Sequence, residues 1–166
     1  VSVMLESGLL DRRGALLRDH PLIVADANGR PNFILATPEK SANDRAIMVS
    51  RRDVAEIQLA KGAIRAGIEI LLREAGIEAE EIDHFVVAGA FGTYIDIDSA
   101  IRVGMFPDLP RDRFQQVGNA AGMGAVLLLL SQETRRSAAK AAQMIDYVEL
   151  TTYAAFQNEF IRYMTF

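Results

Sequence analysis

The most regular pattern of apolar positions lies in the middle of the chain and predicts one long helix. Ser50 and Asp53 have the spacing of a capping box, with Asp in place of the usual Glu. From there to about Ala75, apolar residues recur at steps of three and four, which is typical of one buried helical face, and Gly76 ends the pattern. The expected buried stripe consists of Val54, Ile57, Ile64, Ile68, Leu71 and Ala75.

Short apolar runs alternate with helical segments along the rest of the chain. Phe85–Ala88 is apolar without interruption, which predicts a strand in the interior of a sheet, covered on both faces. The other predicted strands are 33–36, 47–49, 114–117 and 147–150, and the other predicted helices are 98–103, 118–130, 133–144 and 153–163. This alternation predicts a single α/β domain over residues 1–166, with a mostly parallel sheet and flanking helices.

Two glycine-containing turns follow predicted strands and are candidates for ligand binding. The first contains Gly89, Ala90, Phe91 and Gly92, and the second begins with Gly118 and Asn119. Glycine lets a backbone approach a ligand closely, and a helix that starts at Asn119 presents free N–H groups suited to phosphate. Because parallel strands end on one side of a sheet, both turns are expected to face a common cleft.

Tight packing is the alternative explanation of these glycines. A short glycine motif alone is more often a packing feature than a binding site, which applies to the first turn. In the predicted helix after Asn119, Gly122 and Gly124 each cost about 1 kcal/mol relative to alanine, and close packing on the sheet is the preferred explanation of both. Gly118 and Asn119 are as well explained by a ligand as by packing.

Lys61 lies within the apolar stripe of the long predicted helix, near the edge where Gln58 and Arg65 are found. A lysine is almost never fully buried without a partner. Either its stem lies along apolar surface with the ammonium in solvent, or the side chain points into a cleft and meets an anionic or polar ligand.

The composition of the chain excludes several kinds of functional site. The chain has 166 residues, no cysteine and a net charge of −4. Without cysteine it holds no disulfide, thiolate nucleophile or Cys-ligated zinc or iron–sulfur cluster, and the charge gives no basic footprint for nucleic acid. His20 and His84 have no ligand-like neighbours, so no protein metal site is expected, although carboxylates could hold Mg²⁺ beside a nucleotide.

No targeting signal is recognised in the sequence, and a cytoplasmic location is expected. The longest pure apolar run, 125–130, is far shorter than the about 20 residues that span a bilayer, so no membrane contact is expected. No secretory signal pattern begins the chain. Because the first residue is Val1 and not Met, the chain is expected to be a part of a longer protein.

The order of these features resembles the adenosine-binding half of the superfamily of acetate and sugar kinases, heat-shock chaperones and actin. In the chaperones, a helix carrying Glu-x-x-Lys and a strand ending in Gly-Gly hold the adenine nucleoside from two sides. Gln58 and Lys61 match the helix motif, with Gln for Glu, and Gly89 and Ala90 match the strand motif, with Ala for the second Gly. The resemblance implies that these residues, with the rest of both turns, bind ATP.

A closer resemblance, over nearly the whole chain, is to the C-terminal domain of the reductive activators of corrinoid proteins. It rests on four blocks in the same order: 52–68, 87–96, 117–122 and 148–150. It implies a parent protein with an N-terminal [2Fe–2S] ferredoxin-like domain, in which ATP with Mg²⁺ drives electron transfer to the Co(II) state of a corrinoid protein. The other half of the actin-like domain, with the phosphate-binding segment, is then expected upstream of Val1.

Catalytic residues remain unassigned, and three functions remain open. The first is the nucleotide-binding portion of such an activator. The second is a protein-interaction module that keeps the fold and has lost ATP, which the Gln and Ala replacements favour. A metabolite kinase is the third and is disfavoured, since no Asp, His or Ser lies in a recognisable phosphoryl-transfer arrangement. A homodimer is also left open.

Overall fold

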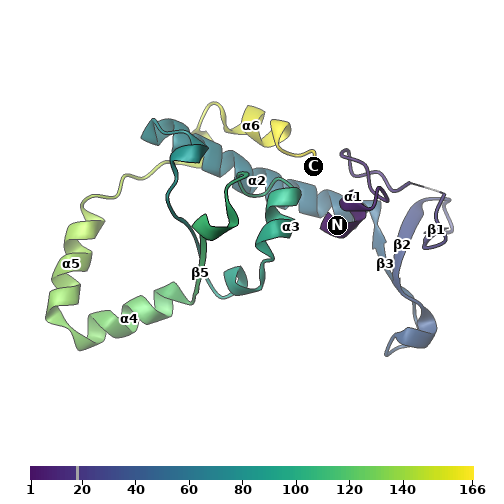
Figure 1. Cartoon of the computed structure of the whole chain (residues 1–166), viewed down its shortest axis with the longest axis horizontal. Coiled ribbons are helices and arrows are strands. Elements are labelled where there is room, and N and C mark those ends of the chain that lie inside the picture. The colour runs from purple at the N-terminus through teal and green to yellow at the C-terminus, as the bar shows by residue number, and fades with distance from the viewer. Residues whose placement is uncertain (18) are drawn as a thin grey trace.

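The computed structural model describes residues 1–17 and 19–166. Its helices are α1 (Ser2–Glu6), α2 (Arg51–Ala75), α3 (Ile97–Arg102), α4 (Ala120–Leu130), α5 (Gln132–Ala142) and α6 (Phe156–Arg162). Its strands are β1 (Ile23–Ala25), β2 (Pro31–Ala36), β3 (Ile47–Ser50), β4 (Phe85–Ala88) and β5 (Phe114–Gly118). Figure 1 shows α2 through the middle of the molecule, with β1–β3 at one end and α4 and α5 at the other.

Helix α2 begins and ends where the sequence predicts. The Ser50 Oγ accepts a hydrogen bond from the Asp53 N–H, and the Asp53 carboxylate accepts one from the Ser50 N–H, so the capping box is confirmed. Hydrogen bonds from Ser50, first from its N–H and then from its hydroxyl, lower the pKa of Asp53. At the other end Gly76 adopts a left-handed conformation with φ 66°, which glycine tolerates without a steric penalty.

The buried face of α2 differs from the predicted stripe. Ile57, Ile64 and Leu71 are exposed, and the buried positions are Val54, Gln58, Lys61, Gly62, Ala66, Gly67 and Ile70. Hydropathy marks large apolar residues, whereas three of these seven buried positions are Gly or Ala and two are polar. The small residues allow close approach: a Cβ on Gly62 would lie 3.2 Å from the Tyr163 carbonyl oxygen.

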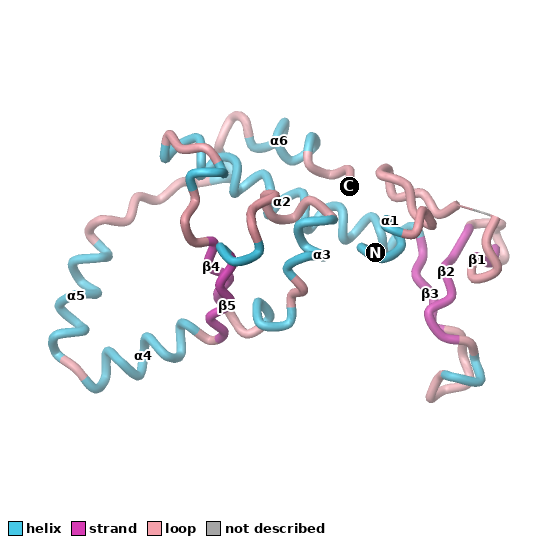
Figure 2. Tube along the Cα trace, viewed as in Figure 1, coloured by secondary structure: helices cyan, strands magenta, loops and turns pink. Residues whose placement is uncertain are grey.

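The strands form two separate sheets (Figure 2). β1, β2 and β3 form an antiparallel sheet, which the pattern of the sequence did not predict as such. β4 and β5 pair in parallel, with Phe85 opposite Phe114. The α/β class and a parallel sheet are therefore confirmed.

The predicted interior position of β4 is wrong for this chain. Within the described residues β4 pairs with β5 alone, only Val87 is buried, and Val86 is 52% exposed. An apolar run predicts that a segment is buried, but it does not show how many strands pair with that segment.

Two boundaries near the C-terminus also differ. No strand forms at 147–150; a short 3₁₀ turn runs from Leu150 to Thr152, because the Glu149 carboxylate accepts a hydrogen bond from the Thr151 N–H. Helix α6 then begins at Phe156, three residues later than expected. A short apolar run beside a carboxylate that accepts from the backbone can form a turn when no strand is available to pair with the run.

Two hydrophobic clusters flank α2. One joins β4 and β5 to α3 and the loop after it, and its aromatic rings pack together in tilted pairs, with the Phe85 centroid 5.0 Å from those of both Phe106 and Phe114. The other packs Val54 of α2 against Met4, Leu10 and Leu16 of the N-terminal segment and is continued by one face of β1–β3. Both sheets therefore take their positions from the same helix.

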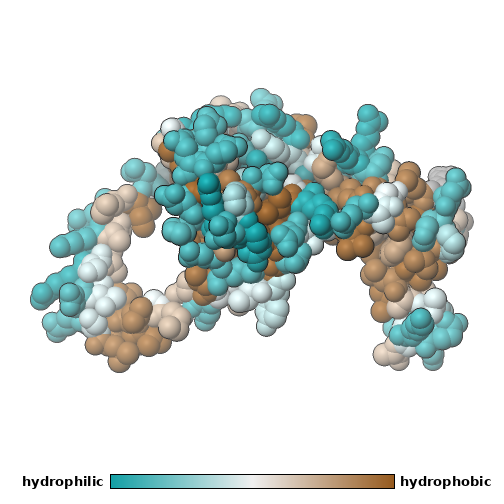
Figure 3. Space-filling view, in the orientation of Figure 1, coloured by the Kyte–Doolittle hydropathy of each residue, from teal (hydrophilic) through white to brown (hydrophobic). Residues whose placement is uncertain are grey.

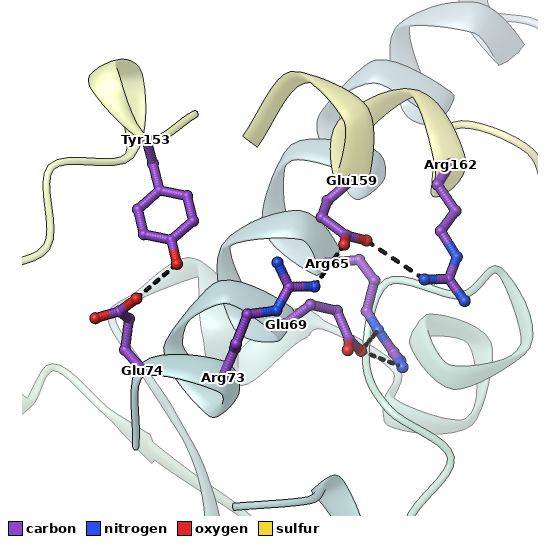
Figure 4. Close-up of polar contacts among 7 residues, drawn as sticks. All are labelled: Arg65, Glu69, Arg73, Glu74, Tyr153, Glu159 and Arg162. Carbon is purple, nitrogen blue, oxygen red and sulfur yellow. Dashed lines mark hydrogen bonds and ion pairs between the residues drawn. The ribbon is translucent and has the colours of Figure 1, made fainter. Parts of the chain in front are cut away.

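Polar pairs between elements far apart in sequence hold α6 along α2 (Figure 4). Glu159 of α6 is only 9% exposed, and its Oε1 lies 2.6 Å from Arg73 Nη2. The Glu159 Oε2 lies 3.6 Å from Arg162 Nη1, which is an ion pair without a hydrogen bond among the described residues. Beside them, the Tyr153 hydroxyl donates to the Glu74 carboxylate at 2.6 Å.

We expect Glu159→Gln to lower the free energy of unfolding by about 1–3 kcal/mol, because a neutral amide replaces the buried carboxylate that accepts from Arg73 and pairs with Arg162. Urea denaturation monitored by circular dichroism measures the change. Glu133→Gln, on the exposed first turn of α5, is the matched control and should change stability by less than about 0.5 kcal/mol. Equal effects of the two substitutions would contradict a structural role for the Glu159–Arg73 pair.

Candidate functional site

The parallel pairing of β4 and β5 brings the two glycine turns side by side, as the sequence predicts. Gly89 follows β4, Gly118 ends β5, and the Gly89 N–H donates to the Gly118 carbonyl oxygen at 2.7 Å. Both glycines have positive φ, 105° and 61°, values that other residues rarely adopt. Nothing lies within 4 Å of the position that a Cβ on Gly89 would take, so this backbone is open to a ligand.

Hydrogen bonds from β5 and from within the turn fix the backbone of the first turn. The Gln116 side chain of β5 donates to the carbonyl oxygens of Gly92 and Ile95, at 2.5 and 2.9 Å, and the Thr93 hydroxyl donates to the Ala90 carbonyl oxygen at 2.6 Å. Gly92 is buried, and a Cβ there would lie 2.9 Å from Val87 Cγ1, so packing explains this glycine. The turn is thus a fixed backbone platform.

The second turn starts α4. The Asn119 side chain accepts a hydrogen bond from the Gly122 N–H at 3.0 Å, which confirms it as the N-cap. A Cβ on Gly122 would lie 2.5 Å from Asn119 Nδ2, so Gly122 makes room for the cap and not for helix-to-sheet packing. Gly124 has nothing within 4 Å of a Cβ position, so packing within this chain does not explain it.

The edge formed by the two turns is open to solvent. Phe91 and Tyr94 are each 88% exposed, and Asn119 is exposed. Exposed aromatic rings can stack on a planar base, and free backbone N–H groups beside them can donate hydrogen bonds to an anion. The edge can therefore offer one side of a nucleotide site.

Gln58 and Lys61 lie elsewhere on α2, among the terminal segments. The Gln58 Oε1 accepts from Arg51 Nη1 at 3.1 Å, and a Cβ on Gly14 would lie 2.7 Å from the same oxygen. Lys61 is 1% exposed; its ammonium donates to the Thr165 carbonyl oxygen and lies 5.4 Å from the centre of the Phe166 ring. The buried ammonium is therefore satisfied by the C-terminal residues, and its contact with a nucleotide, which the resemblance implies, stays a prediction.

Sequence reasoning missed this partner of Lys61 because the two residues are 104 positions apart and a backbone carbonyl leaves no trace in a sequence pattern. Burial and, to a smaller extent, the positive charge of Arg65 together lower the pKa of Lys61 from its usual 10.5 to about 8. The ammonium is therefore costly to keep in the folded chain at neutral pH.

Comparison with known proteins identifies the family. The model of a family described as the C-terminal domain of RACo, the ASKHA domain, matches residues 1–166. The chain belongs to this family. All four sequence blocks that suggested the resemblance, including both glycine turns, lie within the match.

Two curated relatives of this RACo C-terminal domain are corrinoid-activating proteins. The corrinoid activation enzyme RamQ of Eubacterium limosum is 30% identical over 97% of the chain. A Methanosarcina barkeri reductase of a Co(II) methylated amine-specific corrinoid protein is 31% identical over 69% of it. The chain covers 28% and 22% of these two proteins, respectively.

A solved structure named as the reductive activator for a corrinoid, iron–sulfur protein has the same fold. It is 31% identical, superposes with a TM-score of 0.86 and covers 99% of the chain, which in turn covers 26% of that protein. Among the described residues of this RACo C-terminal domain, no helix combines the length and apolarity needed to cross a bilayer.

The pH dependence of stability offers a test of the buried Lys61 in this RACo C-terminal domain. The unfolded chain keeps the Lys61 proton to a higher pH than the folded chain, so the free energy of unfolding should rise between the two pKa values. We expect this residue to contribute a rise of about 2 kcal/mol from about pH 7.5 to about pH 9.5. Urea denaturation at both pH values measures it.

Lys61→Met removes the titrating group and should abolish this part of the rise, while all other groups titrate as before. Lys140→Met, on the exposed face of α5, is the control and should retain it. An identical pH dependence in all three proteins would mean that the Lys61 ammonium is hydrated in solution.

Proposed function

We propose that this chain is the nucleotide-binding C-terminal portion of an ATP-dependent reductive activator of a corrinoid protein. In the proposed reaction, the longer protein would transfer one electron to a Co(II) corrinoid on a partner protein and so give Co(I), and a [2Fe–2S] cluster outside this chain would supply that electron. The observation that carries the proposal is the direct contact of Gly89 with Gly118 at the open end of the parallel pair, in a chain that matches the activator family from end to end.

The residues proposed to contact ATP are those of the two turns. The Gly89–Gly92 backbone, with Phe91 exposed beside it, is suited to the adenosine moiety, since space is open above Gly89. The N–H groups at the start of α4, next to Gly118 and Asn119, are suited to an anionic group. ATP supplies the driving force for an electron transfer that is unfavourable alone.

Gln58 and Lys61 are proposed to act indirectly. Their polar atoms are already used by Arg51 and Thr165, so in this arrangement they fix α2 between the terminal segments. The match to the chaperone helix then reflects a shared position in the fold, and a direct contact with the nucleoside requires the C-terminal residues to move.

The cluster does not fit this chain, and most of the Mg²⁺ site is expected outside it. Without cysteine there are no thiolate ligands for [2Fe–2S], and among the described residues no three His, Asp or Glu side chains are grouped as a metal site. Both are proposed to be held by the remainder of a longer polypeptide, which agrees with the 22–28% of its relatives that the chain covers.

Helix α4 supports the proposal that another half of the actin-like domain covers this one. All but two of its residues are Ala, Met, Val or Leu, the exceptions being glycines, and none is buried in this chain (Figure 3). A helix that is apolar all round is normally enclosed by protein.

The second candidate function is a protein-interaction module with an actin-like fold that no longer binds ATP. Two observations favour it: the Lys61 ammonium already donates a hydrogen bond to the Thr165 carbonyl oxygen, and Gln58 replaces the Glu of the chaperone motif. Calorimetric titration of ATP into the folded full-length protein separates the two candidates, since only the first releases or absorbs heat of binding. The chain alone should bind ATP weakly, because each remaining hydrogen bond contributes only about 0.5–1.5 kcal/mol.

We expect the full-length protein, reduced anaerobically, to convert the Co(II) form of its corrinoid protein to Co(I) only when ATP is present. The corrinoid absorbance reports the change of oxidation state directly. Omission of ATP and omission of the activator are the controls. Reduction that proceeds equally without ATP would remove ATP from the proposed reaction.

Gly89→Ala tests the candidate site. We expect it to weaken ATP binding by the full-length protein by about tenfold or more, since the altered backbone no longer fits the nucleoside. Gly29→Ala is the matched control, because Gly29 has φ 74° and, like Gly89, nothing within 4 Å of its Cβ position. Both substitutions should cost about 1–2 kcal/mol of stability. Equal ATP affinities of the two variants would exclude Gly89 from the site.

A further inference from the structure

A second polar surface lies at the other end of the molecule, where the antiparallel sheet meets the start of α2. Side chains alternate between the two faces of a strand, so Asn32 and Ile34 of β2 share one face. The register places Val24 and Ser50 opposite Asn32, and Met48 opposite Ile34, on that same face. The opposite face, with Ile23, Phe33 and Val49, packs on the N-terminal cluster. We call the first the outer face of the sheet.

A cavity of about 650 Å³ opens on the outer face. Its lining includes Asn32 and Ser50 from the sheet and three arginines, Arg30 from the β1–β2 turn and Arg51 and Arg52 from the first turn of α2. Asn32 is 8% exposed and lies at its base, where its side chain donates to the Arg30 carbonyl oxygen at 3.1 Å.

The three guanidinium groups form no ion pair in the described part of the chain, although Arg52 lies close enough to the Asp53 carboxylate for the two charges to interact. None lies within 4.0 Å of a carboxylate oxygen there, and Arg51 donates only to neutral acceptors, Gln58 Oε1 and the Arg13 carbonyl oxygen. Asp26 also lines the cavity, but its carboxylate accepts from the N–H groups of Asn28 and Arg30 in the turn. This local positive charge contrasts with the net charge of −4 of the whole chain.

Apolar surface continues from the cavity along the outer face. Val24 is 37% and Met48 45% exposed, although each lies within a strand. A small anion would use the arginines and leave these side chains in water. An acidic protein segment would use both, because its carboxylates pair with guanidinium groups in bidentate fashion while its apolar side chains cover Val24 and Met48.

We propose that the outer face of the antiparallel sheet is a docking surface for an acidic segment of a partner protein, with Arg30 and Arg52 as its main charge contacts. Arg51 has a structural part as well, since it ties α2 to the N-terminal turn. The surface is separate from the glycine turns of the candidate nucleotide site, and its partner is recognised by carboxylate charge next to an apolar strip.

The test uses the full-length protein and a fluorophore-labelled poly-glutamate peptide, with binding followed by fluorescence anisotropy at low and high salt. We expect salt-sensitive binding that falls about tenfold or more in R30E/R52E. R136E/K140E, which makes the same charge change on exposed residues of α5, is the matched control and should bind as the unaltered protein does. Neither ATP nor a corrinoid protein is needed, so the result is independent of the proposed function.

Three outcomes would overturn the proposal. The first is absence of peptide binding by the unaltered protein, and the second is an equal loss in R30E/R52E and R136E/K140E, which would report net charge alone. The third is displacement of the peptide by an equal concentration of inorganic phosphate, which would make the cavity a small-anion site. R30Q/R52Q removes the charges without reversing them; if R30E/R52E unfolds, unchanged binding by a folded R30Q/R52Q also rejects the surface.

Discussion

The fold depends on the close packing of the C-terminal segment against the small-residue face of α2. Gly62, Ala66 and Gly67 present at most one methyl group to the C-terminal segment, and a Cβ on Gly67 would already lie 3.3 Å from Leu150 Cδ1. Such contacts are rich in dispersion attraction but give little directional preference. The Arg73–Glu159 pair and the Lys61 hydrogen bond to the Thr165 carbonyl fix the orientation of the C-terminal segment on α2 at two points along the helix. With α2 fixed on this side, both sheets have a rigid element to pack on.

The candidate nucleotide site depends on a different constraint, the parallel register of β4 and β5. Because Ala88 pairs with Gly118, the chain leaves both strands at the same level, and two turns 29 residues apart, from Gly89 to Gly118, share one hydrogen bond. The platform needs no further side chain to bring the turns together. Gln116 then supports the first turn from within the sheet, which makes its backbone geometry a property of the fold.

Sequence reasoning succeeded where a local rule determines the outcome. The capping box at Ser50, the left-handed stop at Gly76 and the Asn119 cap each involve residues a few positions apart, and the structure confirms all three. It failed where partners come from distant segments. The face of α2 was misassigned because α6, about 90 residues later, packs on its small residues, and the acceptor of the Lys61 ammonium was missed because it is a distant backbone oxygen. The juxtaposition of Gly89 and Gly118 was predictable, since parallel pairing fixes it without any side-chain detail.

Helix α4 links the candidate site to the rest of the proposed activator. Its first turn carries the Asn119 cap at the glycine platform, while its later turns consist of glycine, alanine, valine and leucine, none of them buried among the described residues. A ligand that binds the N–H groups of the first turn fixes the direction of the helix axis. A covering domain that packs on Val126, Leu127 and Leu130 fixes the same axis from the other end. The two events therefore favour each other whenever they require the same orientation, and oppose each other when they do not. In the proposed activator, this connection would let a ligand at the glycine turns change how the chain packs against a covering domain.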